Sequence, residues 1–211
     1  MADELVFYTN PMSRGRIIRW MLEEVGVPYR TEILEYGTTM KAADYLAINP
    51  MGKVPAVRRG DEVVTECPAI CAWLADTFPQ AGLAPPAGER AAYYRWLFFA
   101  AGPLEAAVTN RSLGVEVPDD KQGMVGYGNF DAVMDTLQHA VSGGGYVAGD
   151  RFTAADVYVG SHINWGLQFG SIEERPGFAE YWARIGDREA RIRATELDDK
   201  AMPPVEEHGV R

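Results

Sequence analysis

A proline at the entrance of a strand-like run constrains the fold of this chain more than any other residue. Within residues 49–57, Pro55 follows Val54 and directly precedes a hydrophobic run. Proline has no N–H to give to a sheet, so it marks an edge, a turn or a cis bond. A cis-proline beside an edge leaves backbone groups free for an extended peptide. Because Glu66 and Cys67 then open a predicted helix, whose N-terminus attracts carboxylates, the sequence predicts a dock for a small acidic peptide.

The first 78 residues alternate between strand-like and helical patterns. The strand-like runs are residues 5–8, 29–34, 54–58 and 63–65, the last two joined as a hairpin. The helical patterns, in which apolar side chains recur at helical spacing or follow a proline, are residues 14–26, 41–47 and 68–78. Gly26 is placed to end the first helix. This order of elements predicts a compact α/β unit.

A segment rich in proline, glycine and alanine then separates two parts of different character. We expect a first domain at residues 1–79, a linker at 80–88 and a second domain at 89–211. The second part is helical in pattern, with expected helices at residues 89–113 (bent near Gly102), 127–141, 153–169, 178–185 and 187–195. Thr153 and Asp156 match a capping box, and we assign both to folding, worth about 1 kcal/mol or more. The polar tail from Asp198 onward is expected to fray.

Composition and charge exclude several classes of function. The 211 residues carry a formal charge of −10 without a block of Lys or Arg, so we expect no nucleic-acid or membrane partner. We see neither a signal peptide nor an apolar run long enough to span a bilayer. Cys67 and Cys71 form neither a Cys-x-x-Cys redox pair nor a disulfide framework, which favours a reducing, cytoplasmic setting. Three scattered histidines have no metal-ligand spacing, so we expect no metal.

Four segments together resemble those of the cytosolic glutathione transferases. They are residues 7–16, 49–55, 65–70 and 149–156, and the resemblance covers nearly the whole chain. It implies an α/β thioredoxin-like N-terminal domain, an all-α helical C-terminal domain and a homodimer. It also implies that glutathione is the co-substrate, bound mainly by the first domain. The implied enzyme activates the glutathione thiol as a thiolate and adds it to an electrophilic small molecule, a reaction of detoxification.

The turn after the first predicted strand holds three candidate partners for the glutathione sulfur. A free thiol has a pKa of roughly 8.5, so a donor beside the sulfur and a helix N-terminus are needed to favour the thiolate. Ser13 stands where serine-type transferases place their hydroxyl, Tyr8 where the tyrosine-type classes place theirs, and Asn10 lies between them. We favour Ser13 because it begins the predicted helix, with Tyr8 as the alternative. The competing interpretations are that Ser13 only caps the helix and that Tyr8 is a core aromatic.

The resemblance also assigns the residues that hold the peptide. Val54 corresponds to the residue whose backbone pairs with the cysteinyl part of glutathione, and Pro55 to the cis-proline. Glu66 and Cys67 take the positions of a Glu-Ser pair that holds the γ-glutamyl end. Because a thiol is a weaker donor than a hydroxyl, we expect the backbone N–H of Cys67 to hold the carboxylate.

Basic side chains are the expected partners of the glycine carboxylate. Lys41 and Lys53 are candidates for this contact, and Arg14 for facing a carboxylate, although each is as well explained as a surface charge. The electrophile pocket is expected to draw on Phe99 of the long helix and Trp165 of a later one. The other aromatic candidates are Tyr93, Tyr94, Trp96, Phe98 and Phe169. Helix core is the competing interpretation for these aromatics.

Two other functions remain open at this point. The same scaffold supports glutathione-dependent isomerase, peroxidase or reductive chemistry, and the sequence does not distinguish these from conjugation. A non-catalytic, transferase-like binding protein is the alternative outside the enzymes, and the cysteine in place of serine favours it weakly. The transferase class, serine-type or tyrosine-type, is likewise open.

Overall fold

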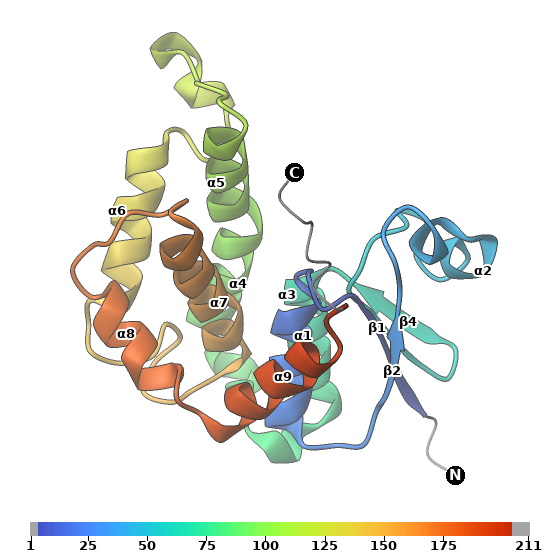
Figure 1. Cartoon of the computed structure of the whole chain (residues 1–211). Coiled ribbons are helices and arrows are strands. Elements are labelled where there is room, and N and C mark those ends of the chain that lie inside the picture. Colours follow the sequence, from blue (N-terminus) through green and yellow to red (C-terminus); the bar gives the residue numbers. More distant parts are fainter. Residues whose placement is uncertain (1–3, 204–211) are drawn as a thin grey trace, which may run out of the picture.

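A four-stranded mixed sheet forms the first half of the chain in the computed structural model, which describes residues 4–203 (Figure 1). Its strands are β1 (Leu5–Thr9), β2 (Arg30–Ile33), β3 (Ala56–Arg59) and β4 (Glu62–Thr65). The order across the sheet is β2-β1-β3-β4. Strand β1 runs parallel to β2 and antiparallel to β3, and β3 and β4 form the predicted hairpin.

Helices cover both faces of this sheet. Helices α1 (Gly15–Val25) and α3 (Cys67–Thr77) lie on one face, and the short α2 (Ala43–Leu46) lies on the other (Figure 1). The alternation of side chains along β1 explains the two layers. Phe7 joins the core under α1 and α3, whereas Tyr8 joins Tyr45 in a smaller cluster on the α2 face. This arrangement confirms the predicted α/β thioredoxin-like part.

The second half is built from helices, as predicted. The long helix expected at residues 89–113 is one continuous run with a π-helical segment at Ala100–Leu104, which contains Pro103. The bend predicted near Gly102 is therefore a local change of helix type. The helices of this half are α4 (Ala91–Phe99), α5 (Glu105–Ser112), α6 (Phe130–Val141), α7 (Ala154–Phe169), α8 (Phe178–Ile185) and α9 (Glu189–Lys200). No described helix is long and apolar enough to cross a membrane.

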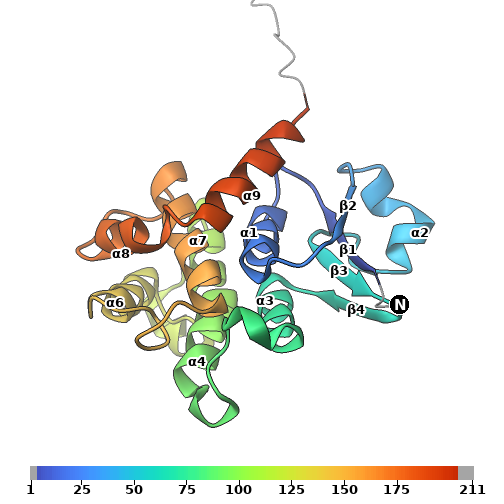
Figure 2. The same cartoon turned by 90° about the horizontal axis from the view of Figure 1, so that it is seen from below.

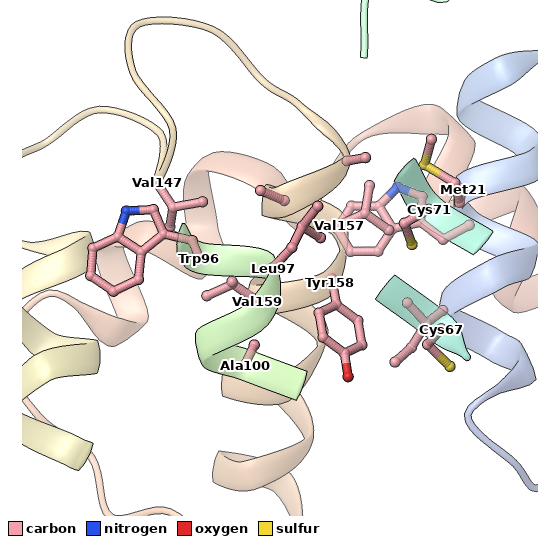
Figure 3. Close-up of a cluster of buried hydrophobic side chains, with 14 of the residues drawn as sticks. Met21, Cys67, Cys71, Trp96, Leu97, Ala100, Val147, Val157, Tyr158 and Val159 are labelled. Atoms are coloured by element: carbon pink, nitrogen blue, oxygen red, sulfur yellow. The ribbon is translucent and has the colours of Figure 1, made fainter. Parts of the chain in front are cut away.

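One continuous core joins the two halves. Met21 of α1, Cys71 of α3, Leu97 of α4 and Val157 of α7 belong to a single buried cluster (Figure 3). Between α3 and α4 the chain makes two short 3-10 turns, and Arg90 holds this segment by donating to the Pro85 carbonyl at 2.8 Å. The two halves therefore share one packed core.

The start of α7 confirms the predicted capping box and shows that it does more than cap. The Thr153 N–H and hydroxyl both donate to Asp156 Oδ2, at 2.9 and 3.0 Å. The other oxygen of Asp156 accepts from the Val147 N–H and the Tyr181 hydroxyl. Asp156 thus ties α7 to the preceding loop and to α8.

The prediction of a fraying tail from Asp198 was wrong. Helix α9 continues to Lys200, and Asp198 is only 1% exposed because Arg19 Nε of α1 donates to its Oδ1 at 2.7 Å. Burial raises the pKa of Asp198, while the neighbouring Arg19 opposes that change. Figure 2 shows α9 packed against α1. The last predicted tail residues, 204–211, lie outside the described part of the chain.

Candidate functional site

A cleft of about 830 Å³ lies where the turn after β1, the loop before Val54 and the end of α7 meet. Seven of the predicted site residues come together there: Ser13, Arg14, Lys41, Lys53, Val54, Trp165 and Phe169. The other lining residues are Pro11, Met12, Arg16, Tyr36, Met40, Gly52, Gln168 and Met202.

Positive charge dominates the lining of this cleft. Four basic side chains, Arg14, Arg16, Lys41 and Lys53, line it, and no Asp or Glu is among its lining residues. The whole chain, in contrast, carries a formal charge of −10. Arg14 pairs with Glu105 and Arg16 with Asp199. Lys41 and Lys53 make no ion pair with any carboxylate of the described residues, so these two lysines supply the uncompensated charge. A local excess of one sign in a cleft raises the local concentration of ligands of opposite sign, so this cleft attracts anions.

The Ser13 hydroxyl occupies the turn that starts α1. It accepts a hydrogen bond from the Gly15 N–H at 2.9 Å and donates to the Asn10 carbonyl at 2.7 Å. Ser13 therefore satisfies the backbone N–H of Gly15, the first residue of α1, and also lines the cleft. The adjacent backbone N–H of Arg14 has no acceptor within residues 4–203. A hydroxyl and an unpaired N–H thus stand together at the positive end of α1.

The other two candidate sulfur partners are occupied elsewhere. Tyr8 is 7% exposed and packs against Tyr45 with ring centroids 5.5 Å apart, on the α2 face of the sheet. The Asn10 amide donates to the Leu34 carbonyl at 2.8 Å and accepts from the Met12 N–H at 2.9 Å. These bonds fix the turn against the end of β2. Of the three candidates, Ser13 alone lines the cleft.

The loop before β3 presents free backbone to the cleft. The Val54–Pro55 bond is cis, as the family resemblance implied. The N–H and C=O of Val54 have no hydrogen-bond partner among the described residues. The loop itself is held firmly, because the Lys53 carbonyl accepts from the Tyr45 hydroxyl at 2.6 Å and from the Asn49 amide at 2.7 Å. An extended peptide could pair with Val54 as an added strand.

Lys41 also fixes this loop. Its Nζ donates to the carbonyls of Met51 and Gly52, at 3.2 and 2.7 Å. Gly52 has a φ of +57°, which few other residues adopt. Lys41 therefore contributes charge to the cleft and also supports the backbone that leads to Val54.

Glu66 and Cys67 face a second hollow rather than the first. This neighbouring hollow of about 440 Å³ is lined by Arg14, Glu66, Cys67, Pro68, Ala69, Ala72, Tyr94, Leu97, Phe98, Ala101, Glu105 and Tyr158. Arg14 lines both hollows and makes an ion pair with Glu105. The predicted peptide-binding residues are thus divided between two adjoining hollows, with Arg14 between them.

Backbone strain marks the entry to α3. Glu66 has a φ of +68° and is the only non-glycine residue within 4–203 in that region. Such strain persists where the surrounding structure requires it, often at ligand sites. No side chain caps α3, so its first N–H groups are open to an anion.

The Cys67 thiol is buried. Its Sγ lies 3.8 Å from the Arg14 carbonyl, and burial raises the pKa of the thiol to about 12. Figure 3 shows Cys67 and Cys71 on α3 inside the packed cluster, close to α1. Both cysteines are free. The buried thiol of this cysteine is thus a poor substitute for the hydroxyl of the expected serine.

The aromatic residues proposed for the electrophile pocket separate in the structure. Trp165 and Phe169 line the cleft, whereas Phe99 packs edge-on against Trp96 with centroids 5.6 Å apart and lines neither hollow. Sequence reasoning missed Gln168, which lies three residues after Trp165 and so shares its helix face. It also missed Arg16 and Met202, for which no local pattern gives a signal. No group of three or more potential metal ligands occurs among the described residues.

Comparison with known proteins gives a consistent result. A family profile described as "Glutathione S-transferase, N-terminal domain" matches residues 12–77. Glutathione S-transferase GST-4.5 of Xanthomonas campestris pv. campestris is 26% identical over 207 residues, covering 90% of this chain and 98% of the relative. Glutathione S-transferase 3 of Zea mays is 28% identical, covering 88% and 90%.

Solved structures agree with these sequence matches. The glutathione transferase of Methylococcus capsulatus str. Bath superposes with a TM-score of 0.76 at 28% identity, covering 93% of this chain and 99% of that one. A glutathione transferase homolog from Sulfitobacter, solved with bound glutathione, has a TM-score of 0.72 at 25% identity and covers 95% and 99%. Residues 12–77 thus match the N-terminal domain of the glutathione S-transferases, and nearly the whole chain is similar to members of that family.

Proposed function

We propose that this protein is a glutathione S-transferase that binds glutathione in the basic cleft and adds its sulfur to an electrophilic small molecule. The observation that carries the proposal is the cleft's charge: four basic and no acidic lining residues in a chain of charge −10. Glutathione carries two carboxylates and one ammonium group, so its net charge suits such a cleft. Its extended backbone also suits the unpaired N–H and C=O of Val54.

We assign the two ends of glutathione from this charge distribution. Lys53, with Lys41 behind it, holds the glycine carboxylate. The γ-glutamyl carboxylate lies at the start of α3, held by the backbone N–H of Cys67 and attracted by Arg14, with Glu66 facing the ammonium group. These two regions are the adjoining hollows on either side of Arg14.

Ser13 is the proposed activator of the sulfur. Its hydroxyl turns from the Asn10 carbonyl, 2.7 Å away in the free protein, to donate to the thiolate. The unpaired Arg14 N–H and the positive end of α1 add to this stabilisation, and preorganised donors are the efficient form of it. Tyr8 remains the alternative partner. Its burial against Tyr45 favours Ser13.

A homodimer and a cytoplasmic setting complete the proposal. Phe98 is 70% exposed beside the second hollow, and Tyr94 on the same helix is also exposed. An apolar surface of this kind suits a contact with a second copy. Two free, buried thiols suit a reducing compartment. Light scattering is expected to give twice the chain mass, and a 23.3 kDa particle at all concentrations would contradict the dimer.

Calorimetric titration with glutathione tests the binding step. We expect saturable binding, weakened about two- to fivefold by Lys53→Met, since an exposed ion pair is worth up to about 1 kcal/mol. Lys121→Met, which removes an exposed lysine outside the cleft, is the matched control. Absence of binding at millimolar glutathione would refute the proposal. Turnover of aryl halides, enones and epoxides, measured on the same preparation, tests the conjugation step.

A further inference from the structure

A small polar chamber of about 160 Å³ adjoins the cleft. Arg16, Trp165 and Gln168 line both, so the chamber meets the cleft at these three side chains. The rest of the chamber comes from α1, α7, α8 and α9. Figure 2 shows α9 crossing over α1 beside α7. The chamber therefore lies directly behind the aromatic end of the cleft and is large enough for a carboxylate or a few waters.

Two buried polar atoms of the chamber's lining residues lack partners. Arg191 Nε and Asp198 Oδ2 are buried and make no hydrogen bond with any residue that the structure describes. Buried donors and acceptors are nearly always paired, with protein, with water or with a ligand. Of these two atoms, the donor Arg191 Nε suits a carboxylate ligand, whereas the acceptor Asp198 Oδ2 suits a donor such as water. Asn164 and Thr195 also line the chamber and offer further polar groups.

The charge of the chamber is positive once its ion pairs are counted. Asp198 is bound to Arg19 at 2.7 Å, and Arg16 to Asp199 at 2.7 Å. Arg191 makes no ion pair with any carboxylate in residues 4–203, and its Cζ lies 5.6 Å from the ring centroid of Trp182. An uncompensated guanidinium with a buried, unpaired N–H is a good partner for a carboxylate.

We propose that the chamber takes the carboxylate of the electrophile and that Arg191 is the residue that determines this specificity. The electrophilic part of the same molecule lies in the cleft against Trp165 and Phe169, within reach of the glutathione sulfur. This inference rests on the proposed transferase function and names the class of its second substrate: an aromatic or apolar electrophile that carries a carboxylate.

A matched pair of aryl chlorides tests the proposal. The substrates are a chloronitrobenzoate and the corresponding chloronitrobenzamide, each with its chlorine para to the carboxylate or amide. The thiolate sulfur bonds to the carbon that carries chlorine, chloride leaves with the C–Cl electron pair, and the thiol proton passes to water. Arg191→Met should lower kcat/KM for the benzoate about tenfold through KM and leave the benzamide within about twofold. Arg191→Lys should retain part of the preference.

Arg193→Met is the control, because Arg193 is an exposed arginine of the same helix that does not line the chamber. Equal losses for both substrates in Arg191→Met, or no loss for either, would overturn the proposal. If the wild type converts neither substrate, the transferase proposal fails on these compounds. The chamber is then tested by calorimetric titration with nitrobenzoate and nitrobenzamide, which cannot react. Arg191-dependent preference for the benzoate supports the chamber, and equal affinity overturns it.

Discussion

Asp156 should be the most consequential single polar side chain for the stability of the helical half. It is fully buried, and its two carboxylate oxygens accept four hydrogen bonds of 2.8–3.0 Å. The donors are the backbone N–H groups of Val147 and Thr153 and the hydroxyls of Thr153 and Tyr181. Asp156→Ala leaves all four donors without their acceptor.

The expected cost follows from these contacts. A hydrogen bond to a charged group contributes roughly 1.5–3 kcal/mol, but the four share one acceptor and are not additive. We therefore expect Asp156→Ala to lower the free energy of unfolding by about 4 kcal/mol. Tyr181→Phe removes one of the bonds and keeps the ring, so it should cost about 1.5 kcal/mol. Thr153→Ala should cost about 1 kcal/mol.

Urea unfolding followed by circular dichroism at fixed protein concentration measures these differences. Asp135→Ala is the matched control, because Asp135 is exposed on α6 and should cost less than about 0.5 kcal/mol. The double variant Asp156→Ala/Tyr181→Phe should cost clearly less than the sum of the single changes. A loss below about 1 kcal/mol for Asp156→Ala, or additive costs in the double variant, would refute the reasoning.

Three further predictions concern the neighbourhood of the cleft. Burial, with the positive charge of Arg14, lowers the pKa of His162 to about 4. Neutral His162 therefore contributes stability above its unfolded pKa of roughly 6.5 that is lost as pH falls toward 4, up to about 3 kcal/mol. His162→Leu should remove this pH dependence of the melting temperature. If the melting temperature of the variant changed with pH as it does in the wild type, the prediction would be contradicted. In Gly15→Ala, the new Cβ would lie 1.9 Å from Thr9 Oγ1, so we expect the free energy of unfolding to fall by about 2 kcal/mol. Adding Thr9→Ala should relieve this loss. Unchanged stability in Gly15→Ala would contradict the prediction. Burial raises the pKa values of both thiols, so a thiol reagent at pH 8 should label the native protein slowly and the unfolded protein fully; fast native labelling would count against the buried assignment.

Local patterns in the sequence were sufficient to predict most of the helices and strands. The capping box of Thr153 and Asp156 and the C-cap at Gly26, which has a φ of +72°, depend on residues close in sequence. Such patterns locate helix ends without knowledge of tertiary structure. The order of strands and helices then predicted a compact α/β unit in the N-terminal part.

Contacts between distant residues could not be predicted in this way. Arg19 and Asp198 are 179 positions apart, and their buried pair is what extends α9 beyond its predicted end. Nothing in the polar tail indicates that one carboxylate will meet an arginine of α1. The same limit explains Phe99, because helical spacing alone does not say which face of α4 borders the second hollow.

The choice between Ser13 and Tyr8 was only partly available from the sequence. Side chains alternate along a strand, so Phe7 and Tyr8 face opposite layers. The sequence did not reveal which layer borders the cleft. The structure puts Tyr8 with Tyr45 under α2 and Ser13 in the lining of the cleft.

The pKa of the glutathione thiol in the complex tests the central claim most directly. It is measured from the thiolate absorbance of the saturated complex as a function of pH, with binding checked by calorimetry for each variant. We predict a pKa below the roughly 8.5 of a free thiol in the wild type and in Tyr8→Phe, and a return toward that value in Ser13→Ala. A thiol pKa that stays low in Ser13→Ala and rises in Tyr8→Phe would contradict the account.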